Sequence, residues 1–327
     1  MQYGFWAKLK KPIFALAPMY DVTDAAFRAI IAKYGKPDIF WTEFVSAEGL
    51  NSAGRERLMP HLWYSDRERP IVAQIFGSHP EAFESTARLL ADLKFDGIDI
   101  NLGCPDKNIM KQGSCAALFK DPKLAQEIIR AAQKGAPNLP VSVKIRIGDT
   151  KVDWKDWIKT LLEARPAAIT IHLRTRKEMS KVSAHWELMP EIVSFINDNA
   201  PEGERPIILG NGDVMTLQEA REKVEQTGCD GVMLGRGIFG NPWLFDRSAN
   251  AGSQTGLTDK KQKLAVLLEH TRLFEQTFAG AKNFEIMKKH YKAYVSGFDG
   301  AKELRAELMA AKNYPEVEKL VEKNLTA

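Results

Sequence analysis

Residues 97–118, GIDINLGCPDKNIMKQGSCAAL, combine a strand pattern with a candidate site. The apolar run at residues 97–101 is typical of a buried strand. It breaks into a polar loop in which Gly103 and Pro105 restrict the backbone on either side of Cys104, and a glycine turn then leads into a helix. A cysteine presented in this way favours chemistry, although a small buried hydrophobic residue is the alternative interpretation.

The same strand pattern recurs outward from this stretch in both directions. Further apolar runs, separated by helical segments, lie at residues 13–17, 38–42, 71–76, 141–146, 168–172, 206–211 and 231–235. Strands that alternate with helices indicate βα units and a parallel sheet. Eight units within about 250 residues match a closed barrel, whereas an open doubly wound sheet would need a G-x-G-x-x-G turn that is absent after the first run. We therefore predict an α/β fold, a (β/α)8 TIM barrel.

The sequence changes character after Phe245. Residues 248–256, SANAGSQTG, are small and polar and predict a linker. Residues 257–327 carry apolar residues at helical spacing and no strand pattern, so they predict a small C-terminal all-helical domain. The predicted domains are a barrel over residues 1–247, a linker over residues 248–256 and a helical domain over residues 257–327.

Composition narrows the class of protein. The chain has 327 residues, 44% of them hydrophobic, and can bury a sizeable core. Its cysteines, Cys104, Cys115 and Cys229, form no even-numbered disulfide framework and indicate a reducing compartment. The N-terminus lacks the apolar core of a signal peptide, and no run approaches the length of about 20 residues that a membrane span requires. We therefore predict a cytoplasmic protein with no membrane contact, and the sequence implies no protein partner.

The net charge of +4 is concentrated near one end of the chain. Residues 260–312 hold eleven Lys or Arg against six Asp or Glu, a local charge of +5, which leaves the rest of the chain close to neutral. Basic charge gathered in one segment favours a polyanionic partner, although a solvated helical surface explains the charge equally well. The predicted basic surface comprises Lys282, Lys288, Lys289, Lys292, Lys302 and Arg305, interleaved with Tyr291 and Tyr294.

Polar groups follow the strand-like runs at the end of the barrel where active sites lie. Each has an ordinary structural explanation, but their repetition around one ring predicts a site. The residues are Pro18, Met19, Gln74, Asn101, Cys104, Lys144, Arg146, His172, Asn211, Gly212, Asp213, Gly235 and Arg236. Glycine turns after the last two runs suit a phosphate, Arg236 can pair with it, and Lys144 and His172 can face an anionic flavin ring. The pattern predicts a phosphorylated planar cofactor and no metal.

The chain resembles the tRNA-dihydrouridine synthases over nearly its whole length. The resemblance implies a barrel that binds FMN and a helical domain that helps to hold tRNA. It also implies reduction of the C5–C6 double bond of specific uridines to dihydrouridine, with NADPH as the reductant. The stretches that carry it are residues 17–19, 23–24, 27–28, 101–105 (N-x-G-C-P), 113–118, 143–146, 172–176, 210–213 (GNGD) and 231–240, and, near the end, Tyr294, Gly297, Phe298, Gly300, Ala301, Leu304 and Arg305.

The resemblance also implies roles for individual residues. Cys104 becomes the acid that protonates C5 while hydride from FMN reaches C6. Implied FMN contacts are Pro18, Met19, Tyr20, Gln74, Lys144, His172, Asn211, Gly212, Asp213, Gly235 and Arg236. Implied substrate contacts are Asn101, Arg146, Arg174 and Arg176.

Three positions depart from the pattern of that family. Tyr20 stands where the family more often has a small residue, and Cys115 replaces a usual glycine. Residues 177–186 lack the common Tyr and Gly before Trp186. These departures lie beside the predicted flavin, the predicted acid and the substrate side of the barrel.

Other activities stay open. Lys144 as a Schiff-base amine, with its pKa depressed by Arg146, would give an aldolase or lyase, but such a site requires neither Cys104 nor a basic tail. A small-molecule FMN dehydrogenase that acts on a free pyrimidine has no use for a helical domain. A catalytically idle tRNA-binding protein has no use for Cys104, Lys144 and His172. Only the flavin-binding interpretations predict a yellow protein.

Overall fold

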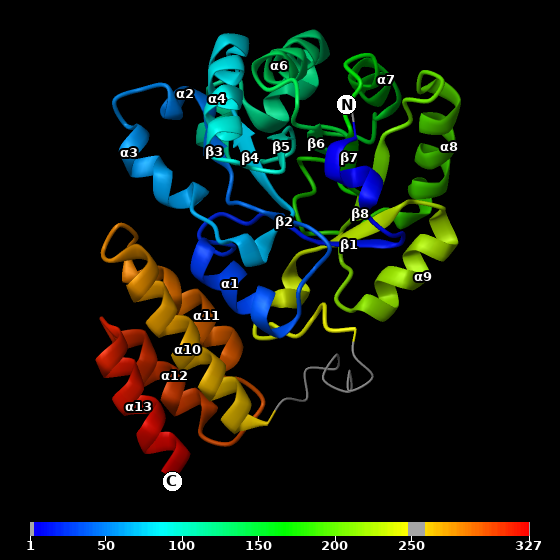
Figure 1. The fold of residues 1–327 in the computed structure, drawn as a ribbon. Coiled ribbons are helices and arrows are strands. Elements are labelled where there is room, and N and C mark those ends of the chain that lie inside the picture. The colour runs from blue at the N-terminus through cyan, green and yellow to red at the C-terminus, as the bar shows by residue number, and fades with distance from the viewer. Residues whose placement is uncertain (1–2, 248–258, 327) are drawn as a thin grey trace.

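The computed structural model describes residues 3–247 and 259–326. The predicted linker, residues 248–256, lies outside the described residues. Figure 1 shows a sheet surrounded by helices, with a smaller group of helices attached at one side. None of the helices described combines the length and the apolar character that crossing a membrane requires.

The strands of the described chain form one parallel sheet. They are β1 (Ile13–Leu16), β2 (Phe40–Trp41), β3 (Val45–Ser46), β4 (Ile71–Phe76), β5 (Gly97–Asn101), β6 (Val141–Arg146), β7 (Ala168–His172), β8 (Ile207–Asn211) and β9 (Gly231–Leu234). The order is β1-β9-β8-β7-β6-β5-β4-β2, and β3 also pairs with β4. The second predicted run therefore provides only the short β2, and β3 begins just beyond it.

The barrel closes between β1 and the segment that precedes β2. Ala15 and Ile39 form an isolated parallel bridge. The Asp38 N–H donates a hydrogen bond to the Phe14 carbonyl oxygen at 2.9 Å, and the Leu16 N–H donates to the Ile39 carbonyl oxygen at 3.4 Å. The predicted (β/α)8 barrel is therefore confirmed.

Helices cover the outside of the barrel, and their starts follow local sequence signals. Asp24 caps the first helix by accepting a hydrogen bond from the Phe27 N–H at 2.9 Å, and prolines begin the fourth and sixth. The barrel helices are α1 (Ala25–Tyr34), α2 (Ala47–Leu50), α3 (Arg55–Leu58), α4 (Pro80–Asp92), α5 (Lys107–Lys111), α6 (Pro122–Gly135), α7 (Lys155–Leu162), α8 (Met189–Asn199) and α9 (Leu217–Thr227).

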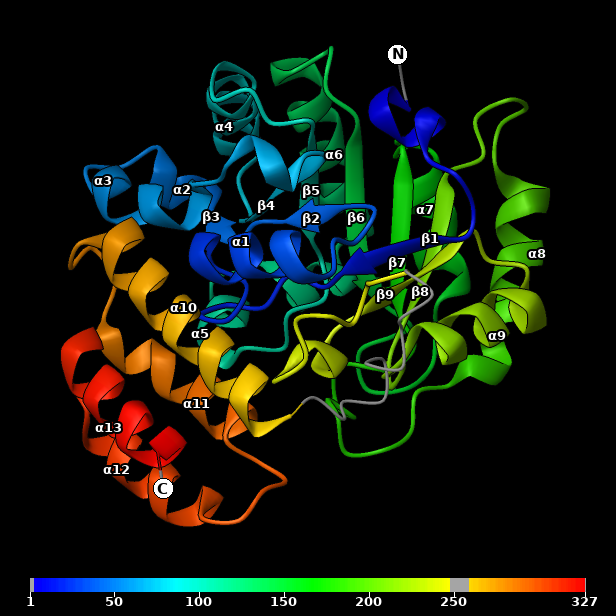
Figure 2. The same cartoon turned by 60° about the horizontal axis from the view of Figure 1, so that its bottom comes forward.

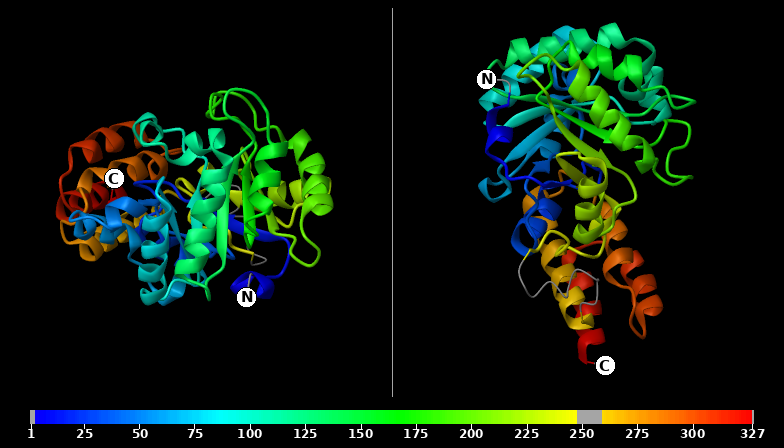
Figure 3. Two further views of the ribbon diagram at one scale, coloured as in Figure 1. Left: turned by 90° about the horizontal axis from the view of Figure 1, so that it is seen from above. Right: turned by 90° about the vertical axis from the view of Figure 1, so that its right-hand side faces the viewer.

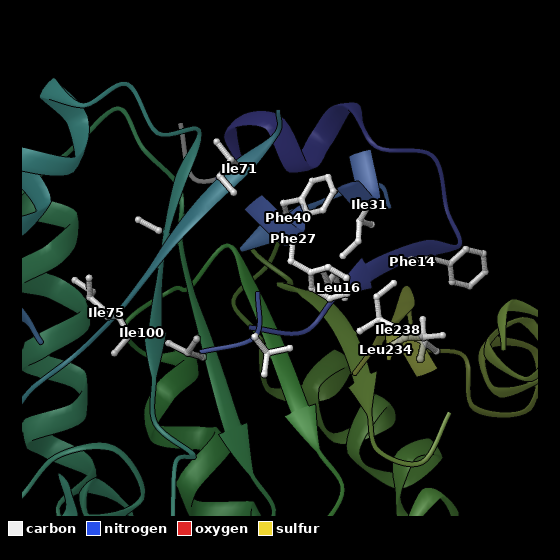
Figure 4. Close-up of a cluster of buried hydrophobic side chains, with 14 of the residues drawn as sticks. Phe14, Leu16, Phe27, Ile31, Phe40, Ile71, Ile75, Ile100, Leu234 and Ile238 are labelled. Atoms are coloured by element: carbon white, nitrogen blue, oxygen red, sulfur yellow. The ribbon is translucent and has the colours of Figure 1, made fainter. Parts of the chain in front are cut away.

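The C-terminal region is helical, as predicted, and packs on the barrel through α1. It comprises α10 (Lys260–Phe278), α11 (Met287–Tyr294), α12 (Ala301–Ala310) and α13 (Tyr314–Thr326). Figure 2 shows α10 beside α1, and Figure 3 shows the two chain ends on opposite sides of the molecule. The ring of Phe27 lies 5.0 Å from that of His270 and 4.5 Å from that of His290. In Figure 4, Phe27 and Ile31 of α1 also meet Leu16 of β1, so one apolar core continues from the barrel to the helical region.

Part of the predicted basic surface is buried. Tyr291 and Tyr294 are fully buried in the helix packing, and Lys282 is buried against Glu43 of the barrel. The prediction that these three residues belong to a basic surface is wrong, because the helical period turns the tyrosines inward and Glu43 pairs with the lysine. Exposed charge remains on α11, where Lys289 and Lys292 follow each other by three residues and share one face.

Candidate active site

A cavity of about 320 Å³ opens at the carboxyl ends of the strands. The parallel register brings the predicted side chains together. Lys144 of β6 is the register partner of Asn101 of β5, and His172 of β7 lies between its register partners Arg146 of β6 and Asn211 of β8. Predicted residues that line the cavity are Pro18, Met19, Lys144, Arg146, His172, Arg174, Asn211, Gly212, Asp213, Gly235 and Arg236.

Cations and amides dominate the strand-end wall of this cavity. Lys144 Nζ donates a hydrogen bond to Asn211 Oδ1 at 3.2 Å, and Asn211 Nδ2 donates to the Met233 carbonyl oxygen at 2.7 Å. Burial and then the nearby Arg146 charge lower the pKa of Lys144 to about 8. Burial and the neighbouring cations also hold the pKa of His172 well below its usual value, so its ring is neutral near neutral pH. The wall therefore carries net positive charge and suits an anionic group.

Asp213 holds the arginines at the other end of the cavity. Its two carboxylate oxygens pair with Arg174 and Arg236, and it also accepts a hydrogen bond from the Ala184 N–H at 2.8 Å. Burial alone would raise the pKa of Asp213, but Arg174 and the Ala184 N–H outweigh it and lower that pKa. Gly212 beside it has φ +135°, and a Cβ there would lie 2.6 Å from the Ala184 Cβ, so the turn requires glycine. Asp213 thus orients the turn and its cations.

A second cavity of about 460 Å³ lies on the other side of the Cys104 loop. Tyr20 lines this second cavity instead of the first, is 50% exposed, and stacks on His61 at 5.2 Å between ring centres. Cys104 lines the second cavity and its neighbour Pro105 lines the first, so this loop is the wall between them. The lining residues of the second cavity are Tyr20, Phe44, Val45, Ser46, Leu58, His61, Phe76, Cys104, Asp106 and Ile109.

A chain of hydrogen bonds inside the barrel fixes the Cys104 loop. Gln74 Nε2 donates to Asp99 Oδ2 at 2.6 Å, and Asn101 Nδ2 donates to Gln74 Oε1 at 3.0 Å. Asn101 Oδ1 then accepts from the N–H groups of Gly103 at 3.1 Å and Cys104 at 3.0 Å. Gln74 and Asn101 are buried and line neither cavity. Their hydrogen bonds position the cysteine.

The predicted arginines also tie loops together. Arg146 Nε donates to the Gly103 carbonyl oxygen at 2.8 Å, and one of its terminal nitrogens donates to the Thr175 carbonyl oxygen at 3.0 Å. Arg176 pairs with Asp149 and lines neither cavity. Arg146 therefore combines a place in the first cavity with support of the Cys104 loop, and Arg176 joins the loops that follow β6 and β7.

The cysteines differ sharply in environment. The Cys104 side chain is partly exposed, and its thiol interacts with the buried Cys115 thiol. The neighbouring Cys115 thiol, against the opposing effect of burial, lowers the pKa of Cys104 to about 7. Cys229 is buried just before β9, where its Sγ contacts Thr227 and the Gly231 carbonyl oxygen. Among the three cysteines, only Cys104 lines either of the two cavities described above.

Comparison with known proteins decides the family. A model of the family described as dihydrouridine synthase (Dus) matches residues 15–327. The chain belongs to the dihydrouridine synthase family. It is 41% identical over 98% of its length to a probable tRNA-dihydrouridine synthase of Staphylococcus epidermidis, of which 96% is covered. It is 40% identical, over 98% of this chain and 97% of the relative, to probable tRNA-dihydrouridine synthase 2 of Bacillus subtilis.

Solved structures with low sequence identity share the fold of this dihydrouridine synthase family member. The old yellow enzyme homologue from Zymomonas mobilis matches with a TM-score of 0.51 and 14% identity, over 80% of this chain and 93% of that one. Histamine dehydrogenase from Rhizobium sp. 4-9 matches with a TM-score of 0.54 and 12% identity, over 80% of this chain and 48% of that one. Both similarities support the barrel fold.

Sequence reasoning missed several residues of the site. Phe44, His61 and Phe76 line the second cavity, and Asp99 anchors the chain of hydrogen bonds. A signal existed for Asp99, because a carboxylate within an apolar strand must find buried partners. Phe76 ends β4 two residues after Gln74, so the period of two also placed it near the strand end. The other two residues lie outside the strands, and no dihydrouridine synthase motif quoted above includes them.

Proposed function

We propose that the protein is an FMN-dependent oxidoreductase that reduces the C5–C6 double bond of uridines in tRNA to give dihydrouridine, with NADPH as the reductant. The observation that carries the proposal is the position of Cys104, on a hydrogen-bonded loop between a cationic cavity and an aromatic one. The relatives named as probable tRNA-dihydrouridine synthases support it over 98% of the chain. A cytoplasmic location is part of the same proposal.

The first cavity suits FMN in size and in chemistry. Its volume of about 320 Å³ falls within the range of about 300–1,000 Å³ typical of small-molecule sites. Arg236 and the glycine turns at residues 211–213 and 235–237 would hold the phosphate, because guanidinium groups and turn amides suit that anion. Met19, Lys144 and His172 would contact the ring system. Gln74 and Tyr20 stay predictions as flavin contacts, since neither lines this cavity.

The chain's own residues supply the proton and the charge stabilisation. Reduced FMN, when bound, supplies the hydride that reaches C6 of the uracil. The Cys104 thiol carries the proton for C5, and Asn101 holds the Cys104 N–H and so its position. Lys144 and Arg146 stabilise the negative charge that develops on the uracil. Direct contacts of Asn101, Arg174 and Arg176 with the uridine stay predictions.

Arg236 provides a direct test of the flavin site. The purified protein is expected to be yellow and to release FMN on denaturation. Arg236→Ala should weaken FMN binding by about 1.5–3 kcal/mol, because it removes a charge-assisted hydrogen bond to the phosphate. Fluorescence titration with FMN measures the change in affinity, and Arg88→Ala on α4, an exposed arginine paired with Glu84, is the control. A colourless protein that takes up no added FMN would refute the proposed cofactor.

A groove beside the second cavity links the barrel to the helical region. Its volume is about 400 Å³, and Tyr20 and His61 line both it and the second cavity. Lys289 of α11 also lines the groove, and its Nζ lies 3.6 Å from Asp21 Oδ2. The exposed lysine face of α11 therefore begins where the path to Cys104 opens. We propose that this face holds tRNA through its phosphates while the target base, taken out of its stack, reaches the barrel.

The charge-reversed variant K289E/K292E tests that surface. For every phosphate that the protein no longer neutralises, the slope of log affinity against log salt should fall by roughly 0.7–0.9, and tRNA binding should weaken. Flavin content and NADPH oxidation should not change. K155E/K159E on α7 makes the same charge change on a distant flank of the barrel and is the control. Equal affinity and equal salt slope in both variants would show that the lysines of α11 are only solvated.

A further inference from the structure

Cys115 occupies a backbone conformation that its side chain disfavours. It begins the 3₁₀ helix Cys115–Lys120 with φ +57°, in the left-handed region. Glycine adopts this conformation freely, whereas a residue with a Cβ does so at a cost. The Cys115 side chain is also completely buried. Such strain persists where surrounding contacts hold it in place, and it occurs most often at functional sites.

The contacts that hold Cys115 lead to Cys104. The Ala116 N–H, next in the chain, donates a hydrogen bond to the Cys104 carbonyl oxygen at 3.3 Å. The two thiols are also close enough for each to shift the pKa of the other. Asn101 fixes the N–H of Cys104, so hydrogen bonds hold this residue at its N–H and at its carbonyl oxygen, and its sulfur lies beside the Cys115 thiol. The turn that contains Cys115 supplies the last two of these three contacts.

The environments decide which thiol donates to the other. Burial raises the pKa of Cys115 well above its ordinary value, so Cys115 keeps its proton and is the donor. Cys104 faces an opening to solvent and its sulfur accepts. The groups around Cys104 act in both directions: the Asp106 backbone lowers its pKa and the Asp106 charge raises it, whereas Arg146 and Lys144 favour the thiolate.

We propose that Cys115 is a positioning residue for Cys104: its buried S–H donates a hydrogen bond to the Cys104 sulfur, directs that thiol and stabilises the thiolate that remains after proton transfer. In the step itself, hydride adds to C6, the Cys104 proton goes to C5, and the electron pair of the broken S–H bond stays on the Cys104 sulfur. Water in the second cavity then returns a proton to it. The step at C5 rests on the proposed function, whereas the thiol pair does not.

Alkylation of the FMN-loaded full chain with iodoacetamide, followed over a range of pH, tests this pairing. Thiolates react, so the midpoint of the rate against pH reports the acidity of Cys104. Trypsin separates the two thiols, because Lys107 and Lys111 lie between them, and mass spectrometry then follows each peptide. The variants are Cys115→Gly, which removes the donor and the strained Cβ, and Cys115→Ser, which keeps an O–H donor. Cys229→Ala removes a distant buried thiol and is the control.

The proposal predicts a distinct order of midpoints. Wild type and Cys229→Ala should share a midpoint near 7. The midpoint of Cys115→Gly should shift toward the ordinary cysteine pKa of about 8.5, so that Cys104 reacts about tenfold more slowly at neutral pH. Cys115→Ser should lie closer to wild type than Cys115→Gly does. Unchanged labelling of the buried Cys229 peptide shows that the fold of each Cys115 variant is intact, and if the glycine variant fails this criterion, the serine variant decides by its midpoint.

Two outcomes would overturn the proposal. One is a folded Cys115→Gly variant whose alkylation midpoint equals that of the wild type. The other is a Cys115→Ser variant whose midpoint equals that of Cys115→Gly, which would show that the side chain at position 115 only fills space and donates no hydrogen bond. Because alkylation needs no tRNA, these outcomes are separate from failure of the proposed function. That failure would instead show as NADPH oxidation by the wild type that leaves the uridines of tRNA unreduced.

Discussion

Replacing Cys104 with alanine is expected to lower the rate of uridine reduction in tRNA by about 10²–10⁴-fold, the usual contribution of a general acid. Bound FMN and NADPH oxidation should remain, because Cys104 lines the second cavity and not the first. Quantifying dihydrouridine in the tRNA against time measures the effect, with Cys229→Ala as the control. An inactive Cys115→Ala beside an active Cys104→Ala would contradict the assignment.

With Cys104 as the proposed acid, the reaction should have a pH dependence with a defined sign. The neighbouring Cys115 thiol lowers the pKa of Cys104 to about 7, and Cys104 donates a proton only while it is protonated. Uridine reduction in the wild type should therefore fall as pH rises through about 7. Single-turnover reduction with pre-reduced protein isolates this step from the reaction with NADPH.

Replacing Lys282 with alanine is expected to destabilise the protein by about 3–5 kcal/mol, because it leaves a buried carboxylate without its lysine partner. Lys282 lies in the turn after α10 and pairs with the fully buried Glu43 between β2 and β3. Burial alone would raise the pKa of Glu43, but His61 and Lys282 outweigh it and lower that pKa. With its pKa lowered in the folded state, Glu43 contributes stability above its unfolded pKa and loses it as pH falls through the folded value.

Urea unfolding at neutral pH measures this change in stability. The control is Lys33→Ala, which breaks an ion pair with Glu269 between the same two parts of the chain. The Lys33 side chain is 50% exposed, and removing an exposed pair should cost only about 0–1 kcal/mol. Adding Glu43→Gln to Lys282→Ala should recover part of the stability, because the uncompensated charge is removed. Equal destabilisation in Lys282→Ala and Lys33→Ala would contradict the account.

Most of the barrel was predictable because parallel strands buried on both faces are continuous apolar runs. Residues 97–101 and 141–146 match β5 and β6 to the residue. The second run was harder, because only Phe40–Trp41 of it pairs as a strand and the chain returns at Val45 to pair with β4 again. Short strands of two residues leave no periodic signal.

The site was predictable where strand ends converge and not where loops or burial decide. Lys144, His172 and Asn211 meet because their strands are adjacent and parallel. Tyr20 follows a strand but turns to the second cavity, where His61 stacks on it. Charge counting placed Lys282 on the surface, since sequence does not reveal that Glu43 lies inside to pair with it. In both cases the sequence did not reveal the partner, His61 for Tyr20 and Glu43 for Lys282, because the partner lies far away in the chain.

The most direct test of the account is the product formed on tRNA. The purified yellow protein is incubated with NADPH and unmodified tRNA, and the nucleosides are analysed by mass spectrometry. The account predicts that uridines in the tRNA gain two hydrogens, with one NADPH consumed for each dihydrouridine formed. Oxidation of NADPH that leaves every uridine of the tRNA unreduced would contradict it.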